Sequence, residues 1–225
     1  MSFGLQFINT SNVVTLDSEF ARLSVLCSGR YLPNSESGVA SITSFPFTIT
    51  SQEPPLVFVR PDTVNAQAGL GLCKIYGQPG AWTGFYVRTV GNGYAPPNGS
   101  WFAAAFMAKP TASFGLRLWD GGSNLIFDSG TPAAVFTRAY QNWSYVGSDS
   151  LAANIRNFYS VPFSSAPNEY MLINNFSMNM VSGNQPGRQL WTIWDFPNSI
   201  LYAMTVATSN PNAFYLPALF AKMTV

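Results

Sequence analysis

Residues 114–129 read FGLRLWDGGSNLIFDS, and a related stretch, FGLQFINTSNVVTLDS, occupies residues 3–18. The two align without a gap at an offset of 111 residues, about half of the 225-residue chain. The identical pairs are Phe3/Phe114, Gly4/Gly115, Leu5/Leu116, Asp17/Asp128 and Ser18/Ser129. A self-match at a fixed spacing indicates a duplicated architecture before any residue is given a chemical role. The repeat therefore predicts two tandem units, residues 1–110 and 111–225.

Each copy of the repeat has the pattern of a β-hairpin, with an apolar strand, a polar turn and a second apolar strand. In the second copy, Gly121 and Gly122 can supply the positive φ angle that such a turn requires. The first copy has no glycine there and must use Asn9 or Asn12.

An aspartate and a serine end both copies, and short polar side chains at such an exit can accept hydrogen bonds from backbone N–H groups. We therefore interpret four residues as a structural hairpin motif: Gly4, Asp17, Gly115 and Asp128.

Short apolar and β-branched runs alternate with glycine- and proline-rich turns along the rest of the chain, which is typical of a β-sandwich or barrel. The candidate strands are residues 47–50, 56–59, 85–90, 101–107, 134–136, 170–173 and 189–194. The sequence thus predicts an all-β protein made of two tandem β-sandwich-like units with little helix. The one candidate helix is SDSLAANIRNF, residues 148–158, where the apolar spacing supports a short helix and an extended segment equally.

Charged residues make up only 9% of the chain, against roughly 25% in an ordinary soluble domain. Because charge usually keeps soluble proteins apart, so low a content favours an oligomer or a protein whose surface is covered by partners. The basic residues are scattered and the net charge is +1, so no nucleic-acid partner is expected. The longest apolar run, residues 101–108, is too short to span a bilayer, and no secretory signal is visible at the start.

The chain contains no histidine and two cysteines, Cys27 and Cys73. The two thiols could pair, but two reduced, partly buried thiols are the favoured interpretation in a chain without a visible export signal. The absence of histidine excludes Ser-His-Asp and Cys-His nucleophile arrangements. We expect no enzyme activity, no cofactor and no metal site.

One short motif is similar to a sequence found at a catalytic site. FDSGT, residues 127–131, matches the string around an aspartic-protease carboxylate, and the repeat supplies a second aspartate at Asp17. That chemistry needs two such loops, but Glu19 stands where the second loop should have a glycine. An aspartic-type hydrolase is therefore only a remote alternative.

Aromatic residues concentrate in the second half of the chain. Most aromatic residues in a β protein pack in the core, but a rigid amphipathic ring can also anchor a protein or saccharide. Trp143, in the polar segment QNWSY at residues 141–145, is the best candidate for such a surface contact. Tyr145 and Trp119 are the other two candidates.

The repeated phrase, with its aromatic-Gly-Leu start and Asp-Ser exit, resembles a family of tail proteins from long-tailed bacteriophages and their prophages. The resemblance covers about 40 residues directly, and the first copy departs from the pattern because it lacks the turn glycine. It implies a structural virion protein at the tail tip or tail-fibre junction, assembled in the cytoplasm of the bacterial host. The implied partners are other tail proteins and further copies of the chain. The alternative is a module of the same tail that recognises a host-surface protein or carbohydrate.

Overall fold

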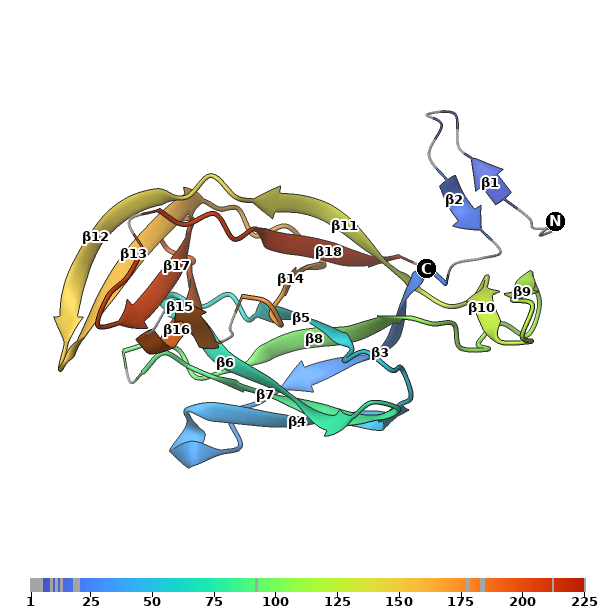
Figure 1. Cartoon of the computed structure of the whole chain (residues 1–225), viewed down its shortest axis with the longest axis horizontal. Coiled ribbons are helices and arrows are strands. Elements are labelled where there is room, and N and C mark those ends of the chain that lie inside the picture. Colours follow the sequence, from blue (N-terminus) through green and yellow to red (C-terminus); the bar gives the residue numbers. More distant parts are fainter. Residues whose placement is uncertain are drawn as a thin grey trace.

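In the computed structural model the chain is almost entirely extended, with 59% of residues in strands and 2% helical. The structure describes residues 6–8, 10, 12, 14–17, 21–91, 93–176, 179–182, 185–211 and 213–224. The prediction of an all-β protein is confirmed, and the 3₁₀ turn η1 (Glu36–Gly38) is the helical element of these residues. Figure 1 shows two sheets and two small hairpins that stand apart from them.

Six antiparallel strands form a closed barrel in the order β11-β18-β14-β5-β8-β3. A short contact between Ala133 and Ser24 closes the ring. The strands are β3 (Leu23–Tyr31), β5 (Leu56–Pro61), β8 (Gly99–Phe106), β11 (Ala133–Tyr140), β14 (Glu169–Leu172) and β18 (Ala218–Thr224).

A second, larger sheet has the order β12-β13-β17-β16-β6-β7-β4, and β15 pairs with β16 beside this path. In Figure 1 its strands β4, β6 and β7 lie below the barrel strands β3, β5 and β8. The strands are β4 (Ala40–Ile49), β6 (Gln67–Gln78), β7 (Ala81–Arg88), β12 (Ser144–Leu151), β13 (Asn154–Pro162), β15 (Asn179–Ser182), β16 (Gln185–Asp195) and β17 (Ile200–Ala207).

Both sheets mix strands from the two halves of the chain, which differs from the predicted separation into tandem units at residues 110 and 111. The barrel takes three strands from each half, and five residue pairs join β6 of the first half to β16 of the second. The physical reason is burial. The barrel strands β5 and β8 of the first half and β14 of the second half are buried on both faces, and the strands that cover them come from both halves. The duplicated sequence covers the hairpins and not a whole domain.

Alternate residues of the barrel strands face two different cores, as expected from the two-residue period of a strand. Phe58 and Phe102 are fully buried inside the barrel, where their rings stack with centroids 4.5 Å apart. Their neighbours Val59 and Trp101 point the other way, toward the large sheet.

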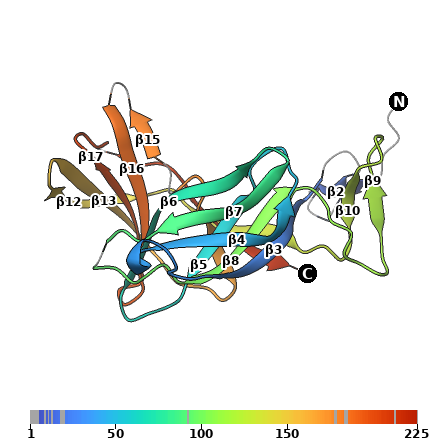
Figure 2. The ribbon, with the colours of Figure 1, turned by 90° about the horizontal axis from the view of Figure 1, so that it is seen from below.

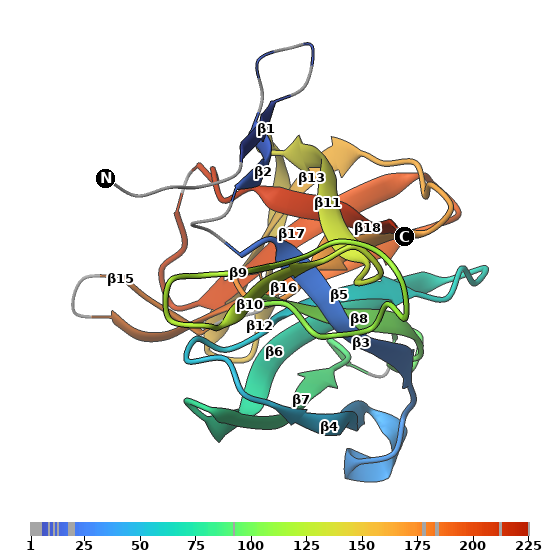
Figure 3. The ribbon, with the colours of Figure 1, turned by 90° about the vertical axis from the view of Figure 1, so that its right-hand side faces the viewer.

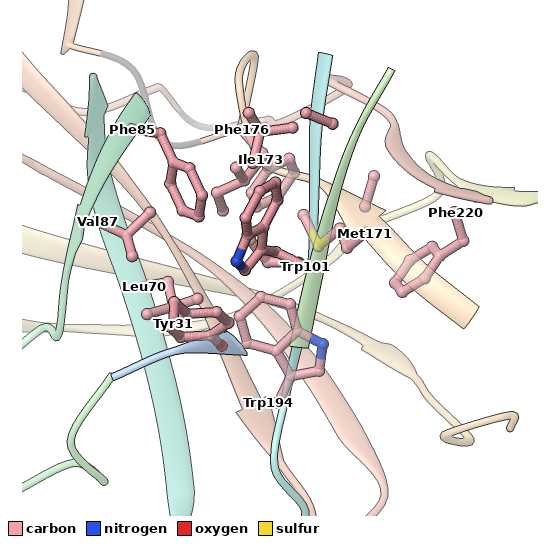
Figure 4. Packing of buried hydrophobic residues seen from close by; sticks show 14 of the residues in the cluster. Tyr31, Leu70, Phe85, Val87, Trp101, Met171, Ile173, Phe176, Trp194 and Phe220 are labelled. Atoms are coloured by element: carbon pink, nitrogen blue, oxygen red, sulfur yellow. The ribbon is translucent and has the colours of Figure 1, made fainter. Parts of the chain in front are cut away.

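The core between barrel and sheet is rich in aromatic side chains. Figure 4 shows Trp101 of the barrel near Phe85 of the sheet, and the two rings meet edge to face with centroids 5.3 Å apart. Met171 and Phe220 reach this core from β14 and β18 and are at most 2% exposed. Because this core joins strands from both halves, it fixes the barrel against the sheet.

The helix considered for residues 148–158 does not form. This segment is the end of β12, a tight turn and the start of β13, which are paired from Ser144↔Ser160 to Leu151↔Asn154. Ala152 has a φ of 52°, as two-residue hairpin turns require. β13 pairs along its length with β17, so tertiary pairing overrides the helical spacing of the apolar residues.

Both thiols are unpaired: Cys27 is buried on β3 and Cys73 lies partly covered on β6. Burial raises the pKa of each thiol to about 12.

Candidate functional site

The two copies of the repeat form two antiparallel hairpins. They are β1 (Gln6–Ile8) with β2 (Val14–Asp17), and β9 (Arg117–Trp119) with β10 (Leu125–Asp128). The first hairpin pairs Gln6↔Asp17, Phe7↔Leu16 and Ile8↔Val14. Adding 111 to each of these residue numbers gives the three pairs of the second hairpin. Even the register shift falls at the same place. The prediction of a hairpin in each copy is confirmed.

The hairpin turns also correspond, although not through the glycines that the sequence suggested. Ser123 has a positive φ of 65°, and the equivalent residue of the first copy, Asn12, has a φ of 59°. Asp120 explains the geometry of the second turn, because its Oδ1 accepts hydrogen bonds of 2.8 Å from the backbone N–H groups of Gly122 and Asn124. The prediction that Gly121 and Gly122 carry the positive φ is wrong, whereas Asn12 was one of the two residues predicted for the first copy.

Asp128 is the centre of the network that fixes the second hairpin. Its side chain is fully buried, and its Oδ2 accepts a 2.7 Å bond from Arg117 Nε. Its Oδ1 accepts bonds from the backbone N–H groups of Gly130, at 2.9 Å, and Ala112, at 3.1 Å, and from the Thr111 hydroxyl, at 3.1 Å. Both carboxylate oxygens are therefore held by donors.

These donors, with Arg117 first, hold the pKa of Asp128 well below its usual range, against the opposing effect of burial. An aspartate that stays ionised well below neutral pH suits the structural role predicted for it. A proton-sharing dyad would instead bring a second carboxylate into contact.

Gly115 is required by close packing at the same hairpin. Its φ is 136°, and a Cβ atom there would lie 2.0 Å from Ser129 Oγ. That hydroxyl accepts a 3.1 Å bond from the backbone N–H of Leu116. Gly4 and the side chain of Asp17, the other two residues of the predicted motif, lie outside the described residues.

The second hairpin presents large apolar side chains to solvent. Phe114 is 94% exposed, Trp119 55% and Leu116 42%. They border a hollow of about 360 Å³ at residues 112–119. On the first hairpin, Ile8 occupies the position equivalent to Trp119 and is 53% exposed. Exposed apolar residues gathered in this way mark an interaction surface.

Both hairpins lie at the same end of the molecule, close to the C-terminus (Figures 1 and 2). Figure 3 looks directly onto this end and shows both hairpins in view together. We call these two hairpins the hairpin end.

The other two predicted contact residues do not join Trp119. Trp143 is half-buried: its Nε1 donates a 2.9 Å bond to the carbonyl of Leu216, and its ring centroid lies 5.7 Å from those of Phe176 and Phe214. It therefore packs against the core. Tyr145 is 53% exposed, with its ring 5.6 Å from that of Tyr159.

Sequence reasoning did not find a groove on the face of the large sheet that points away from the barrel. It consists of two hollows of about 340 Å³ each that meet at Tyr94, and we call it the outer-face groove. Gln67, Tyr94, Asp149, Phe158 and Tyr202 line the first hollow, and Leu151, Arg156, Trp191 and Met204 line the second.

The groove exists because the large sheet curls. The first hollow is lined from β12, β13, β17, β16 and β6, and five neighbouring strands would span about 19 Å if the sheet were flat. A bulge between Tyr145 and Gly147 of β12 bends that strand, as bulges do. The curling brings Asp149 of β12 toward Gln67 of β6.

Polar groups in the groove are held in fixed orientations. Arg156 forms a two-pronged ion pair with Asp149, through Nε at 2.6 Å and Nη2 at 2.5 Å. Gln67 donates its amide N–H to the buried Asp195 at 2.7 Å, which leaves its carbonyl oxygen free to accept.

The groove also holds two tyrosines, Tyr94 and Tyr202, whose hydroxyls make no hydrogen bond to another described side chain. Burial raises the pKa of both phenols, and for Tyr202 the nearby Asp195 adds to the effect. Both hydroxyls therefore remain protonated at neutral pH.

Within the described part of the chain, no three His, Cys, Asp or Glu residues are grouped closely enough to hold a metal ion. Likewise, none of the described segments is a helix long and apolar enough to cross a membrane. Comparison with protein-family models, curated proteins and solved structures gives no match.

Proposed function

We propose that the protein is a structural subunit of a bacteriophage tail, at the tail tip or tail-fibre junction, and that it assembles by protein–protein contact through its hairpin end. The observation that carries this proposal is the pair of hairpins in one register, with exposed apolar side chains at Ile8 and at Phe114, Leu116 and Trp119. Such side chains are costly in solution and become favourable once a partner covers them.

Two further features support assembly. Two copies of one motif on a single subunit suit repeated partner surfaces, as in a particle built from several copies of each component. The charged fraction of 9% suits a protein whose surface is covered by neighbours. The resemblance of the repeated phrase to phage tail proteins suggests that this particle is a bacteriophage tail. On this proposal the protein acts by binding, without catalysis or a cofactor, and resides in the virion after assembly in the host cytoplasm.

The test is incorporation into particles. Tails purified from the bacterium that carries the gene are analysed by mass spectrometry, for the wild-type chain and for the double variant Phe114→Ser/Trp119→Ser. Because both residues are largely exposed, the isolated variant should keep its stability within about 0.5 kcal/mol. We expect the wild type in the tails and the double variant to be depleted from them.

The matched control is Tyr215→Ser, which removes another exposed aromatic ring, 72% exposed, in the segment between β17 and β18. This variant should be incorporated like the wild type. Absence of the wild-type chain from purified tails would disprove the proposal. Normal incorporation of the Phe114→Ser/Trp119→Ser variant would exclude the second hairpin as the contact.

A further inference from the structure

The outer-face groove has a wall that is fixed before any ligand arrives. The loop that carries Tyr94 is attached to β6, because the backbone N–H of Ala95 donates to the carbonyl of Gln67 at 2.8 Å. Thr89 Oγ1 in turn donates to the carbonyl of Ala95 at 3.1 Å. Gly69 permits the close approach, since a Cβ there would lie 2.5 Å from Val90 Cγ2. A preformed wall lowers the entropic cost of binding.

The side chains in this groove offer two kinds of contact next to each other. Phe158, Tyr94 and Tyr202 provide aromatic surface. Beside these rings, the Gln67 carbonyl and the two phenol hydroxyls are available for hydrogen bonds. Apolar faces with a few oriented polar groups are typical of small-ligand sites, and each hollow of about 340 Å³ is within their size range. A sugar ring, with apolar C–H faces and a rim of hydroxyls, matches this combination.

The charges of the groove favour a neutral sugar over an anionic one. Arg156 is the basic residue among those that line the two hollows, and Asp149 already neutralises it through two hydrogen bonds. The buried Asp195 behind Gln67 adds a negative charge. No basic lining group is thus left to pair with a carboxylate, sulfate or phosphate, and an anionic ligand would be repelled. The second hollow is mainly apolar, with Trp191, Met204 and Leu151 among its lining residues. It suits a second sugar unit or its acetamido methyl group.

We infer that the outer-face groove binds a neutral oligosaccharide, with one sugar ring among Tyr94, Phe158 and Tyr202 and the next unit beside Trp191. The Tyr94 and Tyr202 hydroxyls donate to sugar oxygens, and the Gln67 carbonyl accepts from a sugar hydroxyl. This inference does not rest on the proposed tail function, since the groove and the hairpin end use different residues.

The test uses the full chain on a glycan array that carries neutral oligosaccharides of hexose and N-acetylhexosamine, together with sialylated and sulfated ones. Chitotetraose and maltotetraose then serve as solution probes in isothermal titration calorimetry. The double variant Tyr94→Phe/Tyr202→Phe keeps both rings and removes both hydroxyls. We expect it to bind the preferred neutral glycan at least tenfold more weakly, which is the effect expected for two lost hydrogen bonds.

The matched control is Tyr215→Phe, which removes an exposed hydroxyl outside the groove and should leave the Kd unchanged. Three results would overturn the inference: no binding of any neutral glycan by the wild type, preference for sialylated or sulfated glycans, or equal affinity of the Tyr94→Phe/Tyr202→Phe variant. Melting temperatures of the variants show whether a loss of affinity reflects a loss of fold. Incorporation into tails is measured separately, so failure of one proposal is distinguishable from failure of the other.

Discussion

Replacing Gly71 by alanine should destabilise the protein through a single identifiable collision. Gly71 of β6 is the direct cross-strand partner of Trp191 of β16, and the indole lies over the glycine. A Cβ at this position would be 2.1 Å from Trp191 Cε3 and 2.4 Å from Cδ2. Carbon atoms in contact prefer about 3.5 Å or more, so the ring or the strand must move by roughly 1.4 Å.

The indole has little room to move. Trp191 is only 5% exposed and packs with Ile193, Met204 and Val206. Adding a methyl group to such a site typically costs about 1–3 kcal/mol of stability. For a chain of this length that corresponds to a fall in melting temperature of roughly 2–12 °C. Thermal unfolding followed by circular dichroism measures it directly.

Gly91→Ala is the matched control, because a Cβ at Gly91 meets no atom within 4 Å. Its melting temperature should stay close to that of the wild type. The double variant Gly71→Ala/Trp191→Leu tests the cause, since a smaller side chain at residue 191 should remove most of the penalty of the alanine. The reasoning is refuted if Gly71→Ala is as stable as Gly91→Ala, or if the alanine costs as much beside leucine as beside tryptophan.

Two further predictions follow from the pairing and the charges. Asp128→Asn should lower the melting temperature at neutral pH. Because the pKa of Asp128 is depressed in the folded state, the difference in melting temperature between wild type and variant should shrink as the pH falls below about 4, where protonation begins to favour the unfolded wild-type chain. A difference that stays constant from about pH 7 to about pH 2 would contradict this prediction. The fragments 1–110 and 111–225, expressed separately, should each lack cooperative thermal unfolding, because the barrel needs three strands from each half. A cooperative transition in either fragment alone would show that this half is an independent unit.

Local features were predictable from the sequence because they depend on neighbouring residues. The register of both hairpins follows from the aligned apolar positions, and the exit aspartate of the second copy accepts hydrogen bonds from backbone N–H groups, as its position in the repeat suggested. The prediction made from the turn glycines was wrong, because hydrogen bonds to the Asp120 carboxylate, and not the missing side chain of a glycine, set the geometry of the turn. In residues 148–158, the spacing of apolar residues that fits one face of a helix also fits two antiparallel strands joined by a tight turn.

Long-range organisation was beyond local patterns. Nothing in the residues of β6 or β16 specifies that these strands pair across more than 100 positions, because each is an apolar strand that could pair with several others. The groove was missed for the same reason. Gln67, Tyr94, Asp149 and Tyr202 come together only because the sheet curls, and no spacing in the sequence places them side by side.

The two candidate surfaces lie at opposite ends of the long axis. Figures 1 and 2 show the hairpins at one end and β12, β13, β16 and β17, which form most of the groove, at the other. A subunit anchored through its hairpin end would therefore hold the groove away from the anchoring contact. A groove with few hydrogen-bonding groups binds one sugar chain weakly, but several copies in one particle raise the effective affinity by roughly 10²–10⁴ when they engage one surface together. Weak binding of a single chain would thus be compatible with firm attachment of the assembled particle.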